Sequence, residues 1–121
     1  MNKKTNILIV GGTGFIGFHL AKKCLKLNWN VTSLSARRPR NLRSLPKVKY
    51  TVCDISKKNS IKKISSNFDY VVNLGGYVDH GNKKKTYNTH FLGSINLANF
   101  FLKKKNKKIY SNWKWWRIWK N

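Results

Sequence analysis

GGTGFIG, at residues 11–17, follows directly on the apolar run ILIV at residues 7–10 and leads into a helical pattern. Its four glycines satisfy two spacings at once, G-x-G-x-x-G and G-x-x-G-x-x-G. In such a motif one glycine allows a tight turn, one lets the backbone approach a pyrophosphate, and the last lets the helix pack closely on the strand. The unpaired amides and positive dipole end of that helix face the phosphates. The stretch predicts a phosphate cradle for a dinucleotide, against the alternative of a glycine-rich surface turn.

Short apolar runs, typical of parallel strands buried on both faces, alternate with helical patterns along the chain. The runs lie at Ile7–Val10, Val31–Leu34, Val48–Val52 and Tyr70–Leu74. Helices are predicted at residues 16–27, 56–65 and 86–105, with room for a short one in the basic connection at 37–46. This order implies βαβ units with right-handed crossovers, and hence an α/β fold with a Rossmann-type doubly wound parallel sheet. Because 121 residues are few for such a sheet, we expect it to be incomplete, with about four to five strands.

The chain is strongly basic, with 26 Lys and Arg against 3 Asp and Glu and a net charge of +23. Such a balance ordinarily suggests a nucleic-acid or anionic-membrane partner. The lysines, however, fall in predicted loops and on outer helix faces, without the alternation of aromatic and basic residues that lines a stacking groove. We interpret the charge as a solvated surface enriched by a coding bias toward Lys and Asn. This interpretation predicts no nucleic-acid partner and no membrane partner.

Cysteine usage and the amino terminus indicate a reduced, cytoplasmic setting. Cys24 and Cys53 are far apart and form no C-x-x-C motif, as a reduced compartment permits. The start is basic, but the apolar run behind it has only four residues, which is too short for a secretory signal. No stretch is long enough to span a bilayer.

The residues after the second and third apolar runs bear on the choice of cofactor. An acidic residue about 20 positions past the glycines would bind the ribose 2′-hydroxyl of NAD. This chain has Ser35 there, followed by Arg37 and Arg38, and a hydroxyl with two guanidinium groups suits a 2′-phosphate. NADP is therefore favoured over NAD, although the arginines also fit the general basic excess. Asp54, followed by Ile55, could accept a hydrogen bond from the adenine amino group or cap a helix.

With these pieces in place, residues 6–108 resemble the NAD-dependent epimerase/dehydratase family of the extended short-chain dehydrogenase/reductases. The glycine motif is similar to the family's T-G-x-x-G-x-x-G, and residues 54–55 match its Asp-hydrophobic pair on the adenine side. Residues 73–76, NLGG, stand where the family often has His-x-Ala-Ala beside the cofactor, and residues 93–97, GSINL, resemble its G-T-x-N-L. His90 departs from the family's usual Asn, which commonly supports the backbone near the active site.

The resemblance implies part of a nucleotide-sugar epimerase, dehydratase or reductase, in which hydride moves between a sugar carbon and NAD(P) while a tyrosine takes the hydroxyl proton. It also implies a nucleotide-sugar substrate for the full-length enzyme, in a family where homodimers are common. We predict neither metal ligands nor catalytic residues in this chain. The residues predicted to bind the cofactor are Gly11, Gly12, Thr13, Gly14, Phe15, Ile16, Gly17, Ser35, Arg37, Arg38, Asp54, Ile55, Leu74, Gly75 and Gly76.

Residues 109–121, IYSNWKWWRIWKN, differ from the fifth strand and Ser-rich turn that the family has next, and hold four of the five tryptophans. Trp has the single codon TGG, and reading one base later always begins a glycine codon. With A+T-rich codons elsewhere, the shifted frame reads FIQIGSGGEYGK, which supplies that strand and turn. We hypothesise that an extra adenine in the lysine tract at 103–108 shifted the frame. The chain would then be a truncated N-terminal fragment, with a Rossmann part at 1–108 and an aberrant tail at 109–121.

The tail also carries a decoy and an alternative. Tyr110 and Lys114 match the family's catalytic Tyr-x-x-x-Lys, but they fall on the expected fifth strand, too early to act as acid and base beside the nicotinamide. We therefore expect no turnover by this chain alone. Taken at face value, interleaved Trp and Lys or Arg could instead sit at an anionic lipid interface or stack on single-stranded nucleic acid, which would make the chain a small basic binding protein.

Overall fold

The computed structural model describes residues 3–64, 67–74, 84 and 91–101, together with the backbone of residues 108–111. Its elements are, in chain order, β1 (Asn6–Val10), α1 (Phe15–Lys26), β2 (Asn30–Ser35), the 3-10 helix η1 (Asn41–Arg43), β3 (Lys49–Val52), α2 (Lys58–Ile61), β4 (Tyr70–Asn73), α4 (Gly93–Phe101) and β5 (Lys108–Ser111).

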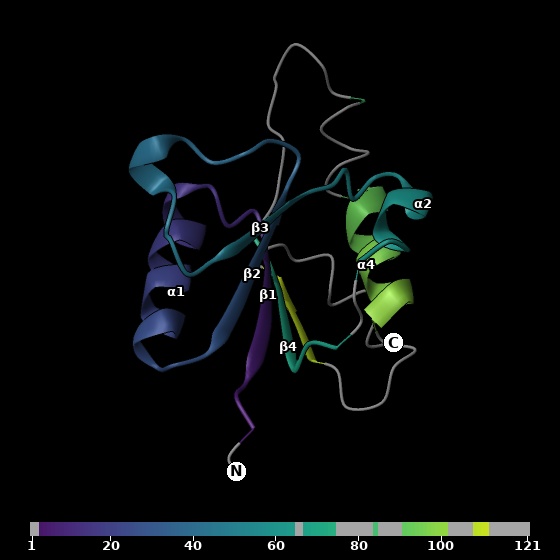
Figure 1. Ribbon diagram of the computed structural model, residues 1–121. Helices are drawn as coiled ribbons and strands as arrows, with labels where there is room; N and C mark the ends of the chain where they lie inside the picture. Colours follow the sequence, from purple (N-terminus) through teal and green to yellow (C-terminus); the bar gives the residue numbers. More distant parts are fainter. Residues whose placement is uncertain (1–2, 65–66, 75–83, 85–90, 102–107, 112–121) are drawn as a thin grey trace.

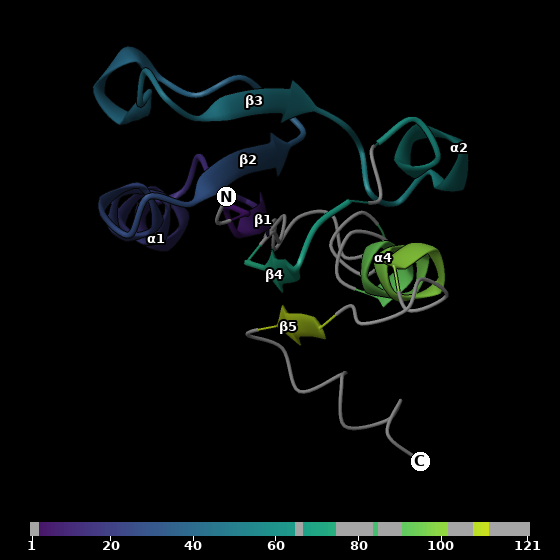
Figure 2. The same cartoon turned by 60° about the horizontal axis from the view of Figure 1, so that its bottom comes forward.

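Five parallel strands form one sheet in the order β3-β2-β1-β4-β5 (Figure 1). α1 covers one face of the sheet, and α2 and α4 cover the other (Figure 2). The predicted α/β fold with a doubly wound parallel sheet is confirmed. β5 spans the predicted domain boundary at residue 108, and the division into 1–108 and 109–121 stays a prediction.

Period-two alternation along β1 divides the hydrophobic core between the two faces of the sheet. Leu8 and Val10 pack in the cluster on the side of α2 and α4, whereas Ile7 and Ile9 pack in the cluster that includes residues of α1. All four side chains are buried. Burying each contributes about 1.5–3 kcal/mol relative to leaving it exposed, so the central strand anchors both layers.

The predicted end of the first helix is confirmed as a Schellman motif. Trp29 donates its amide to the carbonyl of Cys24 at 3.0 Å, and Asn28 donates to Leu25 at 3.0 Å. Asn28 takes the left-handed conformation that such an ending needs, with φ at 63°. The turn delivers the Trp29 ring to β4, where it stacks on Tyr70 with ring centroids 5.6 Å apart.

The helix predicted at 56–65 is much shorter in the structure, where α2 covers only Lys58–Ile61. At its start, the carboxylate of Asp54 accepts hydrogen bonds from the amide and hydroxyl of Ser56, which hold the chain in a turn. At its end, Ile64 donates its amide to the carbonyl of Ile61, three residues back, so the helical bonding pattern has already tightened. The predicted helix at 86–105 is described only over α4.

Both cysteines are free and buried. Burial raises the pKa of the Cys24 thiol, while burial and the nearby charge of Asp54 raise the pKa of Cys53. Both thiols therefore stay protonated at neutral pH and serve as small packing groups. Among the described residues, no helix combines the length and the apolar character that crossing a membrane requires.

Ser33 introduces a polar defect into the core. Its side chain is 1% exposed, and its hydroxyl has no hydrogen-bond partner among the described residues. A buried hydroxyl without a partner costs free energy that an apolar group of similar size would not.

We predict that Ser33→Ala raises the free energy of unfolding by about 1 kcal/mol, because the substitution removes an unsatisfied group and little volume. Urea unfolding checks this. Ser35→Ala is the control, since the Ser35 hydroxyl donates a 2.7 Å bond to the carbonyl of Arg37 and its loss should not stabilise. A destabilised Ser33→Ala variant would contradict the assignment of an orphaned hydroxyl.

Candidate functional site

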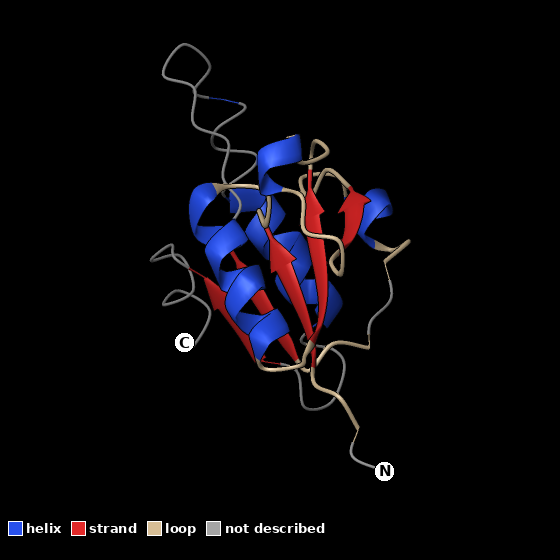
Figure 3. Cartoon of the chain, turned by 60° about the vertical axis from the view of Figure 1, so that its left-hand side comes forward, coloured by secondary structure: helices blue, strands red, loops and turns tan. Residues whose placement is uncertain are grey.

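The carboxyl ends of the parallel strands point toward the same edge of the sheet (Figure 3). From β1 the chain proceeds through α1 to β2 on one side, and it later returns to β4 on the other side of β1. Ligands of open α/β sheets bind in the crevice outside the strand ends where the order reverses in this way. The glycine stretch at residues 11–17 begins directly after β1 and therefore lies at this point.

The loop after β1 is held by three backbone hydrogen bonds. Gly11 donates its amide to the carbonyl of Leu34 at 2.7 Å, Gly14 donates to Gly11 at 3.2 Å, and Phe18 donates to Gly14 at 2.9 Å, which begins α1. Gly11 has φ at 85°, a conformation that side-chain-bearing residues rarely adopt. The sequence prediction of a tight turn here is confirmed.

Two motif glycines are required by packing within the chain. A Cβ on Gly12 would overlap the side chain of Ser33, whose own Cβ would be 2.8 Å away. A Cβ on Gly17 would overlap the carbonyl oxygen of Gly11 and lie 2.6 Å from the Cα of Gly12. Gly17 therefore lets α1 approach the backbone of the loop, as the motif predicts.

Gly14 is different, because no close contact in the described chain excludes a side chain there. Its φ is −76° and ψ is 177°, which any residue adopts. The nearest atom to a Cβ there would be the carbonyl oxygen of Gly11 at 3.5 Å, an ordinary contact. Gly14 is also exposed. The described residues therefore leave the space beside it open to close approach by a ligand.

The first turn of α1 adds donors to this space. An α-helix leaves its first amides without intrahelical partners, and here they belong to Phe15, Ile16 and Gly17. No acidic side chain lies in that turn, and no side chain caps it. The amides and the helix dipole therefore favour an anion at this end. Phe15 and Ile16 carry exposed side chains, at 66% and 63%, so their contribution to phosphate binding would come from the backbone.

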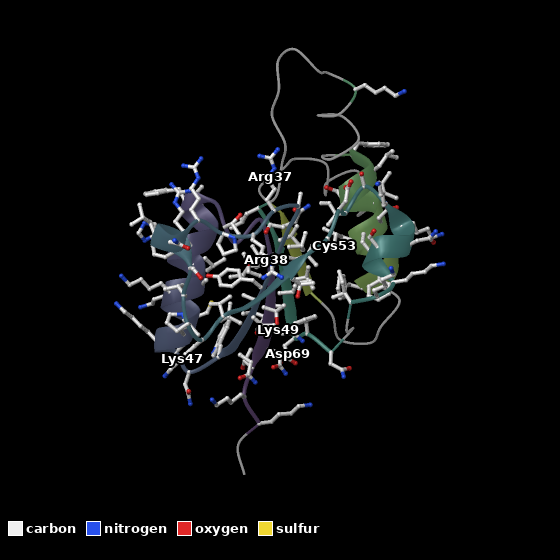
Figure 4. All side chains as sticks on the ribbon, turned by 45° about the horizontal axis from the view of Figure 1, so that its top comes forward. Arg37, Arg38, Lys47, Lys49, Cys53 and Asp69 are labelled. Carbon is white, nitrogen blue, oxygen red and sulfur yellow. The ribbon has the colours of Figure 1, made fainter. Side chains whose placement is uncertain are left out.

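The loop after β2 presents the predicted arginines. The Ser35 hydroxyl donates to the carbonyl of Arg37 at 2.7 Å and so shapes the turn. Arg37 and Arg38 are exposed, and Figure 4 shows Arg37 extending outward from the end of β2. Further along, Tyr50 of β3 uses its hydroxyl to accept from the amide of Leu45 at 2.8 Å, which ties the connection to the sheet.

The predicted adenine-side pair separates into two roles. Asp54 is exposed, and its Oδ1 accepts from the amide of Ser56 at 3.0 Å and from its hydroxyl at 2.7 Å. It therefore stabilises the turn, although the N-cap residue of α2 is Lys57. Neither of these two bonds uses Oδ2, so they leave that oxygen able to accept another hydrogen bond. Ile55 is buried in the core, so its side chain anchors the loop to the hydrophobic cluster.

The fourth strand end contributes Leu74, which donates its amide to the carbonyl of Val10 at 2.8 Å and thus lies beside the start of the glycine loop. Gly75, Gly76 and His90 lie outside the described residues. Thr13 is half-buried within the loop. Tyr110 lies in β5, so residues 108–111 form a strand where the sequence was interpreted as lacking the family's fifth strand. Lys114 lies outside the described residues.

Sequence reasoning missed two polar contacts that join α4 to the carboxyl end of β4 and to the loop after β3. Buried Asn73, at the end of β4, donates to the Ser94 hydroxyl at 3.2 Å. Asn96 donates its side-chain amide to the carbonyl of Ile55 at 3.0 Å. The GSINL motif at 93–97 was the signal for both, but its partners are 21 and 41 residues away and leave no local pattern.

A parallel sheet of this order with a glycine loop at its switch point defines a Rossmann-type dinucleotide-binding unit. The model of the NAD dependent epimerase/dehydratase family matches residues 7–111. The chain belongs to that family.

Two curated relatives match most of this chain. The bifunctional UDP-glucose 4-epimerase and UDP-xylose 4-epimerase 3 of Arabidopsis thaliana is 30% identical over 110 residues, which cover 76% of this chain and 31% of the relative. Alcohol dehydrogenase 2 of Ceratitis capitata is 30% identical over 125 residues, covering 85% and 46%. This chain therefore spans less than half the length of either relative.

Solved structures agree on the fold. WbmF of Bordetella bronchiseptica in complex with NAD+ superposes with a TM-score of 0.76 at 22% identity, over 89% of this chain and 36% of that one. The UDP-glucose 4-epimerase of Thermus thermophilus complexed with NAD gives a TM-score of 0.77 at 19% identity, over 87% and 36%.

We predict that Gly17→Ala lowers the free energy of unfolding by roughly 1–3 kcal/mol, because its Cβ would meet backbone that cannot move aside cheaply. Gly14→Ala should cost less than about 1 kcal/mol, the usual scale for an alanine at a helix N-cap. Urea unfolding of both variants compares them directly. Equal losses would show that Gly14 is also required by packing.

Proposed function

We propose that this chain binds a nicotinamide adenine dinucleotide along the carboxyl ends of β1, β2, β3 and β4, as the coenzyme-binding part of a nucleotide-sugar epimerase, dehydratase or reductase. The observation that carries the proposal is Gly14. Its missing side chain serves no contact within the described chain and leaves room beside the open amides of α1. A pyrophosphate fills such a space.

Each loop has a separate task in this proposal. The backbone of residues 11–17 holds the pyrophosphate, and the fixed bonds from Gly11 to Leu34 and from Gly14 to Gly11 keep those amides oriented before the ligand arrives. Asp54 receives the adenine amino group on the carboxylate oxygen that the turn leaves available. Leu74 and the predicted residues Gly75 and Gly76 border the nicotinamide ribose. The bound nicotinamide supplies hydride transfer.

NADP is the favoured coenzyme. The end of β2 offers two exposed guanidinium groups, of Arg37 and Arg38, and the turn between them and Ser35 contains no carboxylate. A carboxylate there would bind a 2′-hydroxyl and repel a 2′-phosphate. Asp69, the other described acid besides Asp54, accepts from the amide of Asn6 at the far end of the sheet (Figure 4). The Ser35 proton is already donated, so the arginines supply the donors.

The family supports a proposal for the reaction of a full-length enzyme. The relatives include enzymes named UDP-glucose 4-epimerases, so we propose a nucleotide sugar as the substrate class. The two unpaired cysteines, Cys24 and Cys53, are the basis on which we propose the cytoplasm as the location. The described residues supply coenzyme binding, and they include no Tyr-x-x-x-Lys pair on a helix. We therefore propose that this chain binds coenzyme without turnover.

Titration with NADP tests the site. We expect saturable binding by the 121-residue chain, and Gly14→Ala should weaken it by at least about tenfold, because a methyl group would occupy the space for the pyrophosphate. Binding should be measured by calorimetry at about 0.15 M salt and again at higher salt, since a charge of +23 attracts any anion. If folded wild-type chain bound neither coenzyme at millimolar concentration, the proposal would be wrong.

The arginine prediction is separate. Replacing both Arg37 and Arg38 by Gln should lower the ratio of NADP to NAD affinity by about tenfold or more, because each charged hydrogen bond to phosphate contributes roughly 1.5–3 kcal/mol. Arg40→Gln is the matched control, since it removes an exposed arginine from the same connection. A wild-type preference for NAD, or the same ratio in both variants, would overturn the assignment of NADP.

A further inference from the structure

α4 contacts Ile55, in the loop after β3, through two of its residues. Gly93 packs so closely on Ile55 that a Cβ would lie 2.7 Å from its side-chain carbons. Three residues later, on the same face of the helix, Asn96 donates its side-chain amide to the Ile55 carbonyl at 3.0 Å. Both the side chain and the backbone of Ile55 are thus fixed from one helix.

Fixing Ile55 fixes the carboxylate next to it. Asp54 precedes Ile55, and its carbonyl accepts from the amide of Lys57 at 3.1 Å while its carboxylate accepts twice from Ser56. Residues 54–57 therefore form one closed turn. Among the described side chains, Asn96 is the one outside this turn that donates a hydrogen bond to it, through the Ile55 carbonyl.

The same helix also holds the strand end on the other side of the predicted site. Ser94, between the two Ile55 contacts, accepts a 3.2 Å bond from Asn73 at the end of β4. About one turn of α4, residues 93–96, therefore sets the distance between the loop that carries Asp54 and the strand end that precedes Leu74. An extended ligand that contacts both places requires this spacing to be constant.

We infer that Asn96 is a positioning residue for the adenine end of the coenzyme, acting through the Ile55 carbonyl to hold the Asp54 carboxylate in place. The inference rests on the proposed function, because it needs an adenine at Asp54. Asn99 of α4 is an exposed residue of the same type one turn further on, which gives a matched control within the same helix.

The test compares two mononucleotides on the 121-residue chain, 5′-AMP and nicotinamide mononucleotide, which carry similar phosphates but different bases. Asn96→Asp keeps the shape of the side chain, replaces the donor by an acceptor and places it against a carbonyl oxygen. We expect this substitution to lower the affinity for AMP by about fivefold or more, and the affinity for nicotinamide mononucleotide by less than about twofold. Asn96→Gln, which retains the donor, should recover part of the AMP affinity, and Asn99→Asp should leave both affinities unchanged.

A second measurement needs no ligand. The Ser56 amide donates to Asp54 Oδ1 at 3.0 Å, so a loosened turn should exchange this amide hydrogen faster in Asn96→Asp than in wild type or Asn99→Asp. Unchanged exchange together with unchanged AMP affinity would overturn the inference while leaving the proposed function standing. Equal losses for both mononucleotides would overturn it as well, because they indicate a general structural defect. If wild type bound neither AMP nor dinucleotide, the proposed function and the inference would fall together.

Discussion

The close backbone approach between the loop after β1 and the first turn of α1 is the constraint on which this structure depends. Gly17 lets the helix lie against the backbone of Gly11 and Gly12, and Gly14 is the N-cap residue of that helix. A larger side chain at Gly17 would push the helix away from the strand, and the open amides would move with it. The same contact therefore fixes both the packing of α1 and the position of the amides proposed to bind the ligand.

Charge distribution follows the same geometry. α1 has no acid in its first turn and has Lys23 and Lys26 in its last, so the carboxyl end of its dipole is compensated by the chain while the amino end is left for an anion. The two described acidic residues both accept hydrogen bonds from the backbone. Asp69 pairs with the backbone of Asn6 at the opposite end of the sheet, and Asp54 closes the turn after β3. Neither lies in the arginine-bearing loop after β2, which remains cationic.

The site depends on α4 as much as on the glycine loop. The loop after β1 is fixed by bonds that residues 11–18 make locally and with β2, whereas the ends of β3 and β4 are joined through Ser94 and Asn96 of a distant helix. A dinucleotide extends over several strand ends, so its affinity requires that these ends keep their spacing. The helix that sets this spacing touches none of the residues of the glycine loop in the described hydrogen bonds.

The sequence by itself determined the alternation of the first four strands with helices, the glycine loop and the ending of α1. These depend on local rules, namely period-two burial, helical spacing, and the left-handed conformation that glycine adopts freely and asparagine more readily than most other residues. Only the tertiary structure decided that Gly12 and Gly17 are held by packing while Gly14 is free, that Ser33 is buried without a partner, and that Asn96 reaches Ile55. Those facts depend on contacts between residues far apart in the chain, whose distances a pattern of neighbouring residues does not contain.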